Sequence, residues 1–380
     1  MPHQEIYLAA LDQQSCEAMS RLAADIGDGA LADRARGAAE RIQRRLLSDY
    51  YDAGQQFYGF SRNRDGSLDR TATIYPAVAW WSGNLSLPRA DRMLTRWASE
   101  EFSTDWGTRD VSRREAVYDP ISYHQGTVWP LFTGWVALAE YRAGRSLSGY
   151  AHLMQNADLT FAQDLGALTE LLSGAYFQPL GRSTPHQMWS SAMVLAPAIR
   201  GLFGLEADAQ RHTLRIDPHL PAGWDQAIVH SVPLGENRLD VTYRRSGARL
   251  EVEVRSTKPA IFCVATKETP KDNECKEPAT TVRRLDLSLP PVELDLPHGL
   301  PLPGARTTQV KALRDEAGER GRTVRLAGQA GSNCEFTVRL NRPAVRVEGG
   351  SLRGNRLLVE FASTGADDAG YVTQELRFTW

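Results

Sequence analysis

The sequence predicts an α+β multidomain protein in which α-helical hairpins are followed by an antiparallel β-sandwich. Two patterns support this prediction. Apolar residues recur at helical spacing up to about residue 205, and short alternating runs bounded by turn residues follow from about residue 206. At 380 residues the chain also exceeds what one hydrophobic core usually holds. We therefore expect two domains, residues 1–205 and 206–380.

Six segments of the first part have the apolar spacing of amphipathic helices. They lie at about 4–26, 30–48, 87–99, 130–142, 148–162 and 184–202. Pro130 suits the first turn of a helix. In the last segment Thr184 is the expected N-cap, Pro185 takes the first helical position, and Gln187 completes a capping box. Pro197 is expected to kink this helix.

The second part consists of short alternating runs. These are LRID, RLDVTYRR, RLEVEVRS, TVRLAG, EFTVRL, RLLVEF and ELRFTW, with turn signals such as GEN, SGA and GGS between them. Many short strands at near-regular spacing are typical of a β-sandwich. Residues 256–305 are rich in Pro, Thr and Lys, and we expect long loops there.

Composition excludes several classes of protein. The net charge of −2 gives no electrostatic footprint for nucleic acid or an anionic membrane. No apolar stretch is long enough to span a bilayer. The first residues, MPHQEIYLAAL, have no signal-peptide pattern, so a cytoplasmic location is the default unless the true N-terminus lies upstream. Cys16, Cys263, Cys275 and Cys334 have no metal-ligand spacing; Cys263 and Cys275 could close a loop, but free thiols are favoured.

Tryptophans are concentrated in the first part of the chain. Seven of the nine precede residue 200, namely Trp80, Trp81, Trp97, Trp106, Trp129, Trp135 and Trp189. An indole offers a flat apolar face and a polar edge, which suits the C–H faces of sugars. Trp97 and Trp135 lie at helical spacing and are expected in the core, whereas Trp106 and Trp129 lie in polar loops and are expected to contact a ligand.

Three loops of the first part concentrate polar and aromatic side chains. They are FSTDWGTRD at 102–110, YDPISYHQGTVWP at 118–130, and TELLSGAYFQPLGRSTPHQMW at 169–189. If neighbouring hairpins lie side by side, these loops meet at one end of the helical domain. A pocket lined by aromatic rings, amides and carboxylates would result.

Two of these loops resemble a known enzyme superfamily. TELLSG followed by STPHQMWSSAMVL resembles the last catalytic loop of glucoamylases and bacterial glycogen-debranching amylo-1,6-glucosidases, and YHQGTVWP resembles the YH-x-G-x-[VI]-WP loop of their sugar pocket. LRIDPHLPAGW and VPLG resemble, more weakly, the β-domain after the barrel. The resemblance covers about residues 1–205. It implies the C-terminal half of an (α/α)6 barrel of six helical hairpins, followed by a β-domain.

The resemblance implies hydrolysis of α-glycosidic bonds in glucans or oligosaccharides by an inverting mechanism. Such hydrolysis needs two carboxylates on opposite sides of the scissile bond. By the resemblance, Glu170 is the water-activating general base; from position alone it would be a solvated loop carboxylate. No cofactor is implied, and no His or carboxylate spacing indicates a metal.

The same loops supply the expected sugar-binding residues. They are Trp106, Asp119, Tyr123, His124, Gln125, Trp129, His186 and Trp189. For His124 and His186, a hydrogen bond to a sugar hydroxyl and a role in holding the loop are equally weighted. Arg109 and Asp110 are expected to form a local ion pair or to be solvated.

The expected general acid has no clear candidate. In the family it lies on a loop shortly before the helix that EIYLAALDQQSCEAMSRLAADIG matches, which would place it upstream of Met1. A truncated start, a second chain and a degenerate fold are the alternatives. Of the carboxylates that could substitute, Asp119 is favoured over Asp105 and Glu5.

The incomplete barrel also bears on the partners that we expect. A carbohydrate is the expected ligand, and self-association or a second chain could complete the barrel. The alternative functions are a non-catalytic carbohydrate-binding protein and a structural subunit of a split glycosidase.

Overall fold

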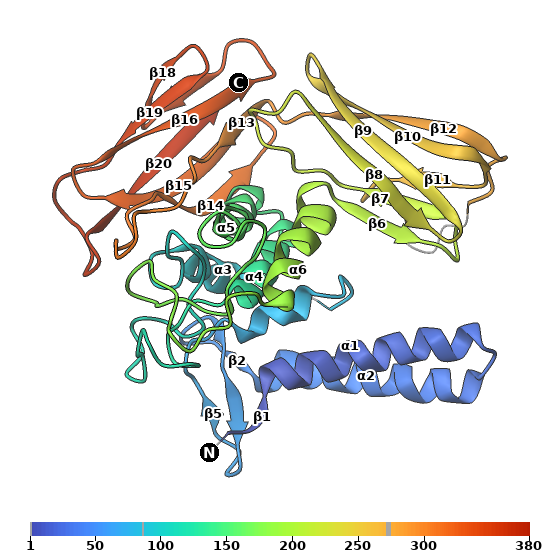
Figure 1. Ribbon diagram of the computed structural model, residues 1–380, viewed down its shortest axis with the longest axis horizontal. Helices are drawn as coiled ribbons and strands as arrows, with labels where there is room; N and C mark the ends of the chain where they lie inside the picture. Colours follow the sequence, from blue (N-terminus) through green and yellow to red (C-terminus); the bar gives the residue numbers. More distant parts are fainter. Residues whose placement is uncertain (1, 86, 271–274) are drawn as a thin grey trace.

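The computed structural model describes residues 2–85, 87–270 and 275–380. The helices lie in the chain up to Leu202, and β-structure follows from Leu205, antiparallel except where β11 pairs with β7, which confirms the predicted α+β class. In Figure 1, helices α4, α5 and α6 lie at the centre with two β-units above them, and the α1–α2 hairpin extends to one side.

The helical region is a series of paired helices. They are α1 (Ile6–Asp25), α2 (Gly29–Asp49), the 3₁₀ helix η1 (Tyr75–Trp80), α3 (Asp91–Ala98), α4 (Pro130–Arg142), α5 (Ser146–Leu159), α6 (Met188–Pro197) and the π-helical turn η2 (Ala198–Leu202). At the α1–α2 turn, the side chain of Asp28 accepts a hydrogen bond from the Leu31 N–H and caps α2.

Helix α4 forms the centre of the helical region. Nearly all of its residues are buried, so it is covered by neighbours on every side. Gly134 lets α6 come close, because a Cβ there would lie 2.4 Å from the Cβ of Met193. Asn156 of α5 donates to the carbonyl oxygens of Pro130 and Met193, which joins the three helices.

The last helix begins later than predicted. Helix α6 starts at Met188, and no side chain caps its N-terminus, so the predicted capping box at Thr184 is wrong. The physical reason is competition from loop hydrogen bonds. The carbonyl of Thr184 accepts from Glu170 N–H, and Gln187 N–H donates to Leu168 O. Beyond Pro197, which has no N–H to donate, the helix continues as the wider turn η2.

Small strands accompany the first helices. Strand β1 (Pro2–Glu5) precedes α1, and between α2 and η1 lie β2 (Tyr51–Asp52), β3 (Phe57–Tyr58), β4 (Ser61–Asn63) and β5 (Leu68–Asp69). Strands β1, β4 and β5 form one antiparallel sheet, and β2 pairs with β3. The register places Glu5 opposite Ser61, so Glu5 is held where α1 begins.

The first β-unit follows η2 directly. Its strands are β6 (Leu205–Asp208), β7 (Thr213–Ile216), β8 (Gln226–Leu234), β9 (Asn237–Ser246), β10 (Arg249–Ala260), β11 (Cys263–Ala265) and β12 (Thr280–Ser288). They form sheets β12-β10-β9-β8 and β11-β7-β6. Inward residues of both sheets, such as Leu214 and Val241, share one core.

The second β-unit occupies the rest of the chain. Its strands are β13 (Val292–Asp295), β14 (Lys311–Ala317), β15 (Gly321–Gln329), β16 (Asn333–Leu340), β17 (Arg346–Glu348), β18 (Ser351–Arg353), β19 (Arg356–Glu360) and β20 (Tyr371–Thr379). Sheets β13-β16-β19-β18 and β14-β15-β20-β17 enclose a separate core around Phe336 and Leu376.

The β-region therefore differs from the single predicted sandwich. It contains two units with separate cores, which stand apart in Figure 1. Strands β12 and β13 lie within 256–305, where loops were expected. Strand β12, TTVRRLDLS, pairs only with β10 at a sheet edge and keeps most of its side chains partly exposed. An edge strand of this kind carries many polar residues and resembles a loop in composition.

The structure also corrects the expectation for two cysteines. Cys263 and Cys275 form a disulfide, with their Cα atoms 5.4 Å apart, whereas Cys16 and Cys334 are free. Cys275 is brought near the start of β11 because its N–H donates to the carbonyl of Arg211. Within the residues described, no helix combines the length and the apolar character needed to cross a bilayer.

Candidate active site

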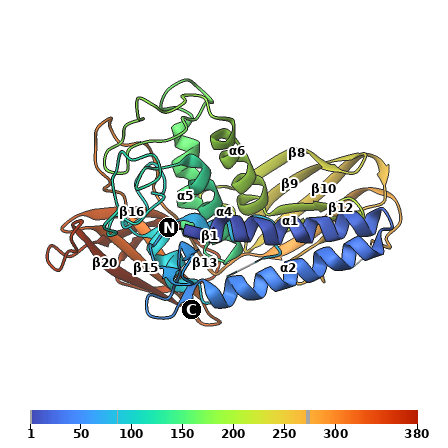
Figure 2. The same ribbon diagram turned by 90° about the horizontal axis from the view of Figure 1, so that it is seen from below.

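Backbone hydrogen bonds join the three polar loops. Isolated bridges pair Arg109 with Val128 and Val128 with Leu172, so one residue from each loop lies in line. The N–H groups of Val128 and Leu172 each donate to the other's carbonyl at 2.9 Å. The loops lie together at one end of α4, α5 and α6 (Figure 2). This arrangement brings residues separated by more than 60 positions to one place.

Two glycines permit this close approach. A Cβ on Gly174 would lie 1.9 Å from the carbonyl oxygen of Gly126. Gly126 has a φ of 148°, and a Cβ there would lie 2.5 Å from the ring of Tyr118. Only glycine fits at either position, since any side chain would push the two loops apart. The Gly174 N–H also donates to the Pro120 carbonyl at 2.8 Å.

Glu170 lies at the junction of these loops. Its side chain is nearly buried, and Oε1 accepts a hydrogen bond from the Tyr123 hydroxyl at 2.6 Å. The backbone N–H of Thr184 lies 3.5 Å from Oε2. Burial and the neighbouring Glu170 raise the pKa of Tyr123 to about 12, so this hydroxyl remains protonated and donates to the carboxylate. The carboxylate is thus held in one orientation from both sides.

An aromatic wall adjoins Glu170. The His124 ring stacks on Trp129 with centroids 5.1 Å apart and planes 9° apart. Tyr123 meets both rings edge-on, at 4.7 Å and 4.8 Å. The Trp129 indole N–H donates to the Tyr123 carbonyl at 3.1 Å. Burial lowers the pKa of His124, although the charges of Glu170 and Glu5 oppose this effect, so the imidazole is neutral at pH 7.

The aromatic wall continues to residues that the sequence did not single out. Ring contacts run from Trp129 to Phe132 and Trp135, and then to Tyr7 and Tyr75. Both tyrosines are only partly buried. Tyr7 lies at the start of α1 and Tyr75 begins η1, so no local motif marks them as neighbours of the YHQG loop. Only the packing of α1 and η1 against α4 brings them there.

Trp106 does not face a ligand pocket. Its side chain is fully buried in a small core with Val128, Leu172 and Phe177. The indole N–H donates to the Ser173 carbonyl at 2.9 Å. The expectation that Trp106 contacts a sugar is therefore wrong. Its polar neighbours in sequence are themselves buried beneath the joined loops.

Asp119 and Gln125 are exposed and take part in local loop contacts. The carboxylate of Asp119 accepts from Ile121 N–H at 3.1 Å, and its own N–H donates to the Gln125 carbonyl at 2.7 Å. The Gln125 side chain accepts from the Ser122 hydroxyl at 3.0 Å. These bonds hold the turn that presents Tyr123 and His124.

His186 and Trp189 lie on the exposed approach to α6. The imidazole of His186 is 2.5 Å from a carboxylate oxygen of Asp164, and both side chains are largely exposed. Trp189 is 44% exposed in the first turn of α6. Exposure leaves both rings available to another molecule or segment.

The comparison with protein families agrees with this arrangement. Residues 6–190 match the model of the mannosylglycerate hydrolase MGH1-like glycoside hydrolase domain. The matched part of this chain is thus similar to a glycoside hydrolase domain with a six-hairpin glycosidase-type fold. The family that matches is named for mannosylglycerate hydrolase, not for glycogen debranching. The second half of the chain lies outside the match.

Solved structures are similar to parts of this chain, and the first of them supports its fold. A sialidase has a TM-score of 0.57 and 17% identity over 66% of this chain and 25% of its own. A GH78 rhamnosidase of Bacillus sp. GL1 gives 0.49 and 19% over 69% and 25%. The GH63 mannosylglycerate hydrolase of Thermus thermophilus gives 0.42 and 16% over 50% and 44%. This chain thus spans about a quarter of the sialidase. A search of curated proteins gave no match.

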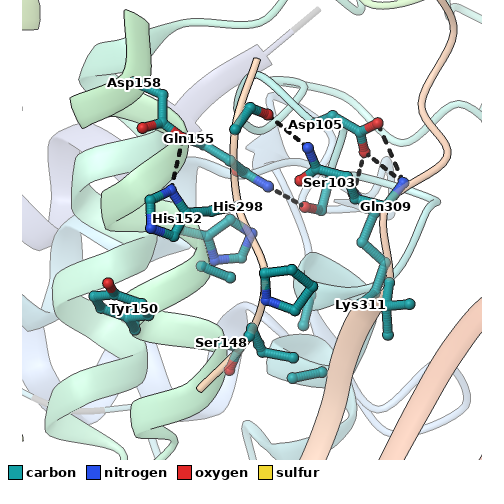
Figure 3. A pocket seen from close by; sticks show the side chains of 17 residues that line it. Ser103, Asp105, Ser148, Tyr150, His152, Gln155, Asp158, His298, Gln309 and Lys311 are labelled. Atoms are coloured by element: carbon teal, nitrogen blue, oxygen red, sulfur yellow. Dashed lines mark hydrogen bonds and ion pairs between the residues drawn. The ribbon is translucent and has the colours of Figure 1, made fainter. Parts of the chain in front are cut away.

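The side chain of Asp105 is bound by a distant segment of the chain. It is buried, and Lys311 Nζ lies 2.9 Å from its Oδ1. The N–H groups of Thr308 and Gln309 also donate to it, as Figure 3 shows for Gln309. Burial tends to raise the pKa of Asp105, but Lys311 and the hydrogen bonds lower it overall, so it remains ionised. A charged, fully paired carboxylate cannot serve as the general acid.

Arg109 and Asp110 are buried and not solvated. The Arg109 guanidinium donates to the carbonyls of Gly174 and Glu100 at 2.7 Å and 2.8 Å, and so ties the first loop to the third. Burial raises the pKa of Asp110 well above its usual range. The structure therefore shows Arg109 as a buried structural cation, and burial favours the protonated form of Asp110. Among the residues described, no group of three His, Cys, Asp or Glu side chains is arranged to hold a metal.

Substituting Gly174 tests whether the loop contact positions Glu170. In Gly174→Ala the new methyl group meets the Gly126 carbonyl, so we expect Tyr123 to move from Glu170 and sugar affinity to fall by about tenfold or more. Stability should fall by about 1–3 kcal/mol. Isothermal titration with an α-glycoside and urea unfolding measure the two effects.

Gly181 in the same loop provides a matched control. A Cβ there meets nothing within 4 Å. Gly181→Ala should therefore change stability by less than about 0.5 kcal/mol and leave sugar affinity unchanged. Equal behaviour of the two variants would show that the Gly126–Gly174 contact does not position the site.

Proposed function

We propose that this chain carries the catalytic base of an inverting glycoside hydrolase acting on α-glycosides. The observation that supports the proposal most strongly is the setting of Glu170. It is nearly buried, oriented by Tyr123, and adjacent to the aromatic wall of His124 and Trp129. A general base needs a fixed carboxylate beside a site that a sugar ring can fill.

In this proposal each residue has a distinct role. Glu170 takes a proton from the water that attacks the anomeric carbon. The Tyr123 hydroxyl holds Oε1 and leaves Oε2 to bind the water. Trp129 and the neutral His124 contact the apolar face and the hydroxyls of the sugar.

The general acid is proposed to come from a helical segment that completes the barrel. Apolar side chains on α1 and α6 favour such a partner, since Leu22 is 61% exposed and Met188 85% exposed. Exposed apolar faces of this kind mark surfaces that another element covers. That element could be an upstream segment of the same polypeptide, a second copy of this chain or a different chain. Glu5 is the alternative within this chain, because its charge, like that of Glu170, acts on His124 and opposes the lowering of the His124 pKa by burial.

Product analysis tests the proposal. The chain is incubated with mannosylglycerate, maltose, isomaltose and trehalose, and proton NMR follows the first anomer released. Inversion of an α-glycoside releases the β-anomer first. We expect binding of at least one substrate and slow turnover by the chain alone, because an absent acid costs about 10²–10⁴-fold. Release of the α-anomer first would contradict the inverting mechanism.

The acid and the alternative functions are separated by further measurements. Fast hydrolysis that Glu5→Gln abolishes would assign the acid to Glu5. Sugar binding without turnover, even when the barrel is completed, would favour the non-catalytic carbohydrate-binding protein. A chain that binds no sugar and only assembles with a helical partner would be a structural subunit.

A further inference from the structure

A second cavity lies at the far end of helix α4. Its volume is about 390 Å³, within the range of small-molecule sites. It is lined by the C-terminal end of α4, by Arg200 of η2, and by residues of β6 and β7 in the first β-unit. Helix α4 has 13 residues and Trp129 precedes it, so this cavity lies about 20 Å from Trp129, at the other end of the helix. It is therefore separate from the candidate active site.

The side chains around this cavity carry excess positive charge. Four cations, Arg142, Arg200, Arg215 and Lys267, face two acids, Glu206 and Asp217. These six side chains therefore carry a net charge of +2, to which His219 adds nothing when it is neutral. A concave site with one sign of charge concentrates ions of the opposite sign.

Two of the cations are held in place by hydrogen bonds. The Arg142 guanidinium donates to the Trp81 carbonyl at 2.8 Å and pairs with Glu206 at 2.5 Å. Arg215 donates to three backbone carbonyls, those of Thr266, Thr269 and Pro270, which orient its guanidinium without neutralising its charge.

A lysine and a histidine complete the rim. Lys267 lies 3.4 Å from Asp217, and its side chain is mostly exposed. The His219 ring lies 5.4 Å from the ring of Tyr141, and the two ring planes are tilted by 42°. The rings of His219, Tyr141 and Trp80 supply apolar surface to the cavity.

Arg200 is the cation whose donors are free. Among the residues described, no hydrogen bond or ion pair to its guanidinium is made, although the group is only partly exposed. It lies over the Trp81 ring at 5.1 Å, which fixes its position without using its N–H groups. Burial and the nearby Arg142 lower its pKa, whereas Glu206, which pairs with Arg142, raises it, so Arg200 feels both a cation and a carboxylate without bonding to either.

We propose that this cavity binds a small molecule bearing a phosphate or carboxylate group, with Arg200 and Lys267 as the residues that recognise the anion. A planar guanidinium with free donors matches an oxyanion. The rings of His219 and Tyr141 then contact the rest of a sugar-sized ligand. The inference goes beyond the proposed glycosidase activity and does not depend on it.

Isothermal titration at low salt tests the proposal. The probes are inorganic phosphate, glucose 6-phosphate, glucuronate and uncharged glucose. We expect at least one anion to bind, glucose not to bind at this cavity, and the affinity to fall as salt is raised. Phosphate binding as tightly as glucose 6-phosphate assigns recognition to the anion alone. Tighter binding of glucose 6-phosphate or glucuronate adds the sugar contacts.

Three variants locate the site. Arg200→Met keeps the stem over Trp81 and removes the donors, so the affinity for the anion should fall about tenfold or more. Lys267→Met changes an exposed side chain and should weaken binding without affecting folding, which covers the case in which Arg200→Met does not fold. Arg34→Met, on the exposed face of α2, is the matched control and should bind normally.

The outcomes that overturn the proposal are distinct from failure of the glycosidase assignment. Absence of anion binding by the unmodified chain, or equal binding by Lys267→Met and Arg34→Met, would overturn it. Glu170→Gln should bind the anion normally because Glu170 lies near the other end of α4. A chain without hydrolytic activity that still binds the anion would refute only the proposed function.

Discussion

Replacement of Glu170 by glutamine is expected to lower kcat by about 10²–10⁴-fold and to change KM little. The amide keeps the shape of the side chain and can still accept from the Tyr123 hydroxyl. It cannot take a proton from the attacking water, so an interaction made in the transition state is lost while aromatic contacts to the sugar remain. The limb of the pH profile that reports the base should also disappear.

The measurement uses the form of the protein that hydrolyses the substrate, whether the chain alone or the completed barrel. Glu236→Gln, in an exposed turn of the first β-unit, is the control and should retain full activity. Azide added to Glu170→Ala can enter the space left by the side chain. It should yield a glycosyl azide of inverted configuration, which identifies the position of the lost base.

Near-normal kcat in Glu170→Gln would contradict the proposed base. The contacts of Glu170 with Tyr123 and Thr184 would then have a structural role only, in joining the second and third loops. Glu5 and Asp119 would be the next carboxylates to examine. The match of residues 6–190 to a glycoside hydrolase domain would stand, but the catalytic interpretation of these loops would not.

Replacement of Asp105 by alanine is expected to destabilise the protein by about 3–5 kcal/mol. The carboxylate pairs with Lys311 and accepts from the hydroxyl of Thr307 and the N–H of Thr308, all from the segment leading into β14. Both charged side chains are almost completely buried. Removal of one leaves an unpaired charge in a nearly buried site, and it releases the segment that carries Gln309 and Lys311 in Figure 3.

Urea unfolding and amide hydrogen exchange of residues 305–313 measure this effect. Because the pKa of Asp105 is lowered, its stabilising contribution is present above the usual Asp pKa near 3.9 and is lost as the pH falls below it. Wild type and Asp105→Ala should therefore converge in stability in acid.

A second ion pair between the same regions provides the control. Arg113 pairs with Asp368 at 2.6 Å, but Asp368 is mostly exposed. Asp368→Ala should cost less than about 1 kcal/mol, because exposed pairs contribute little. The double variant Asp105→Ala, Lys311→Met removes both buried charges and should recover part of the loss. A cost below about 1 kcal/mol for Asp105→Ala would show that the pair does not anchor the second β-unit.

Local patterns were sufficient for the elements themselves. The runs RLDVTYRR, RLEVEVRS and ELRFTW are strands β9, β10 and β20, because alternation along a strand is visible wherever one face is buried. The helices beginning at Gly29 and Pro130 agree with prediction within a residue or so. The number of β-units was not visible, because two adjacent sandwiches and one larger sandwich share the same alternation.

Capping and burial depended on partners distant in sequence. Thr184 has the right neighbours for an N-cap, yet the backbone hydrogen bond from Glu170 holds it in the loop. Trp106 lies among polar residues and is nevertheless buried, because two further loops cover it. The role of Asp105 required Lys311, which lies 206 positions away.

The sequence by itself determined the class of the chain, most of its helices and strands, and the loops that carry Tyr123, His124, Trp129 and Glu170. These features depend on residue type and spacing along short stretches of the chain. Only the tertiary structure decided which side chains of those loops meet. The Tyr123–Glu170 contact depends on two glycines, Gly126 and Gly174, whose close approach is a property of the packed backbone. Tyr7, Tyr75 and the cationic cavity at Arg200 likewise arise from contacts between elements, which spacing along the chain does not record.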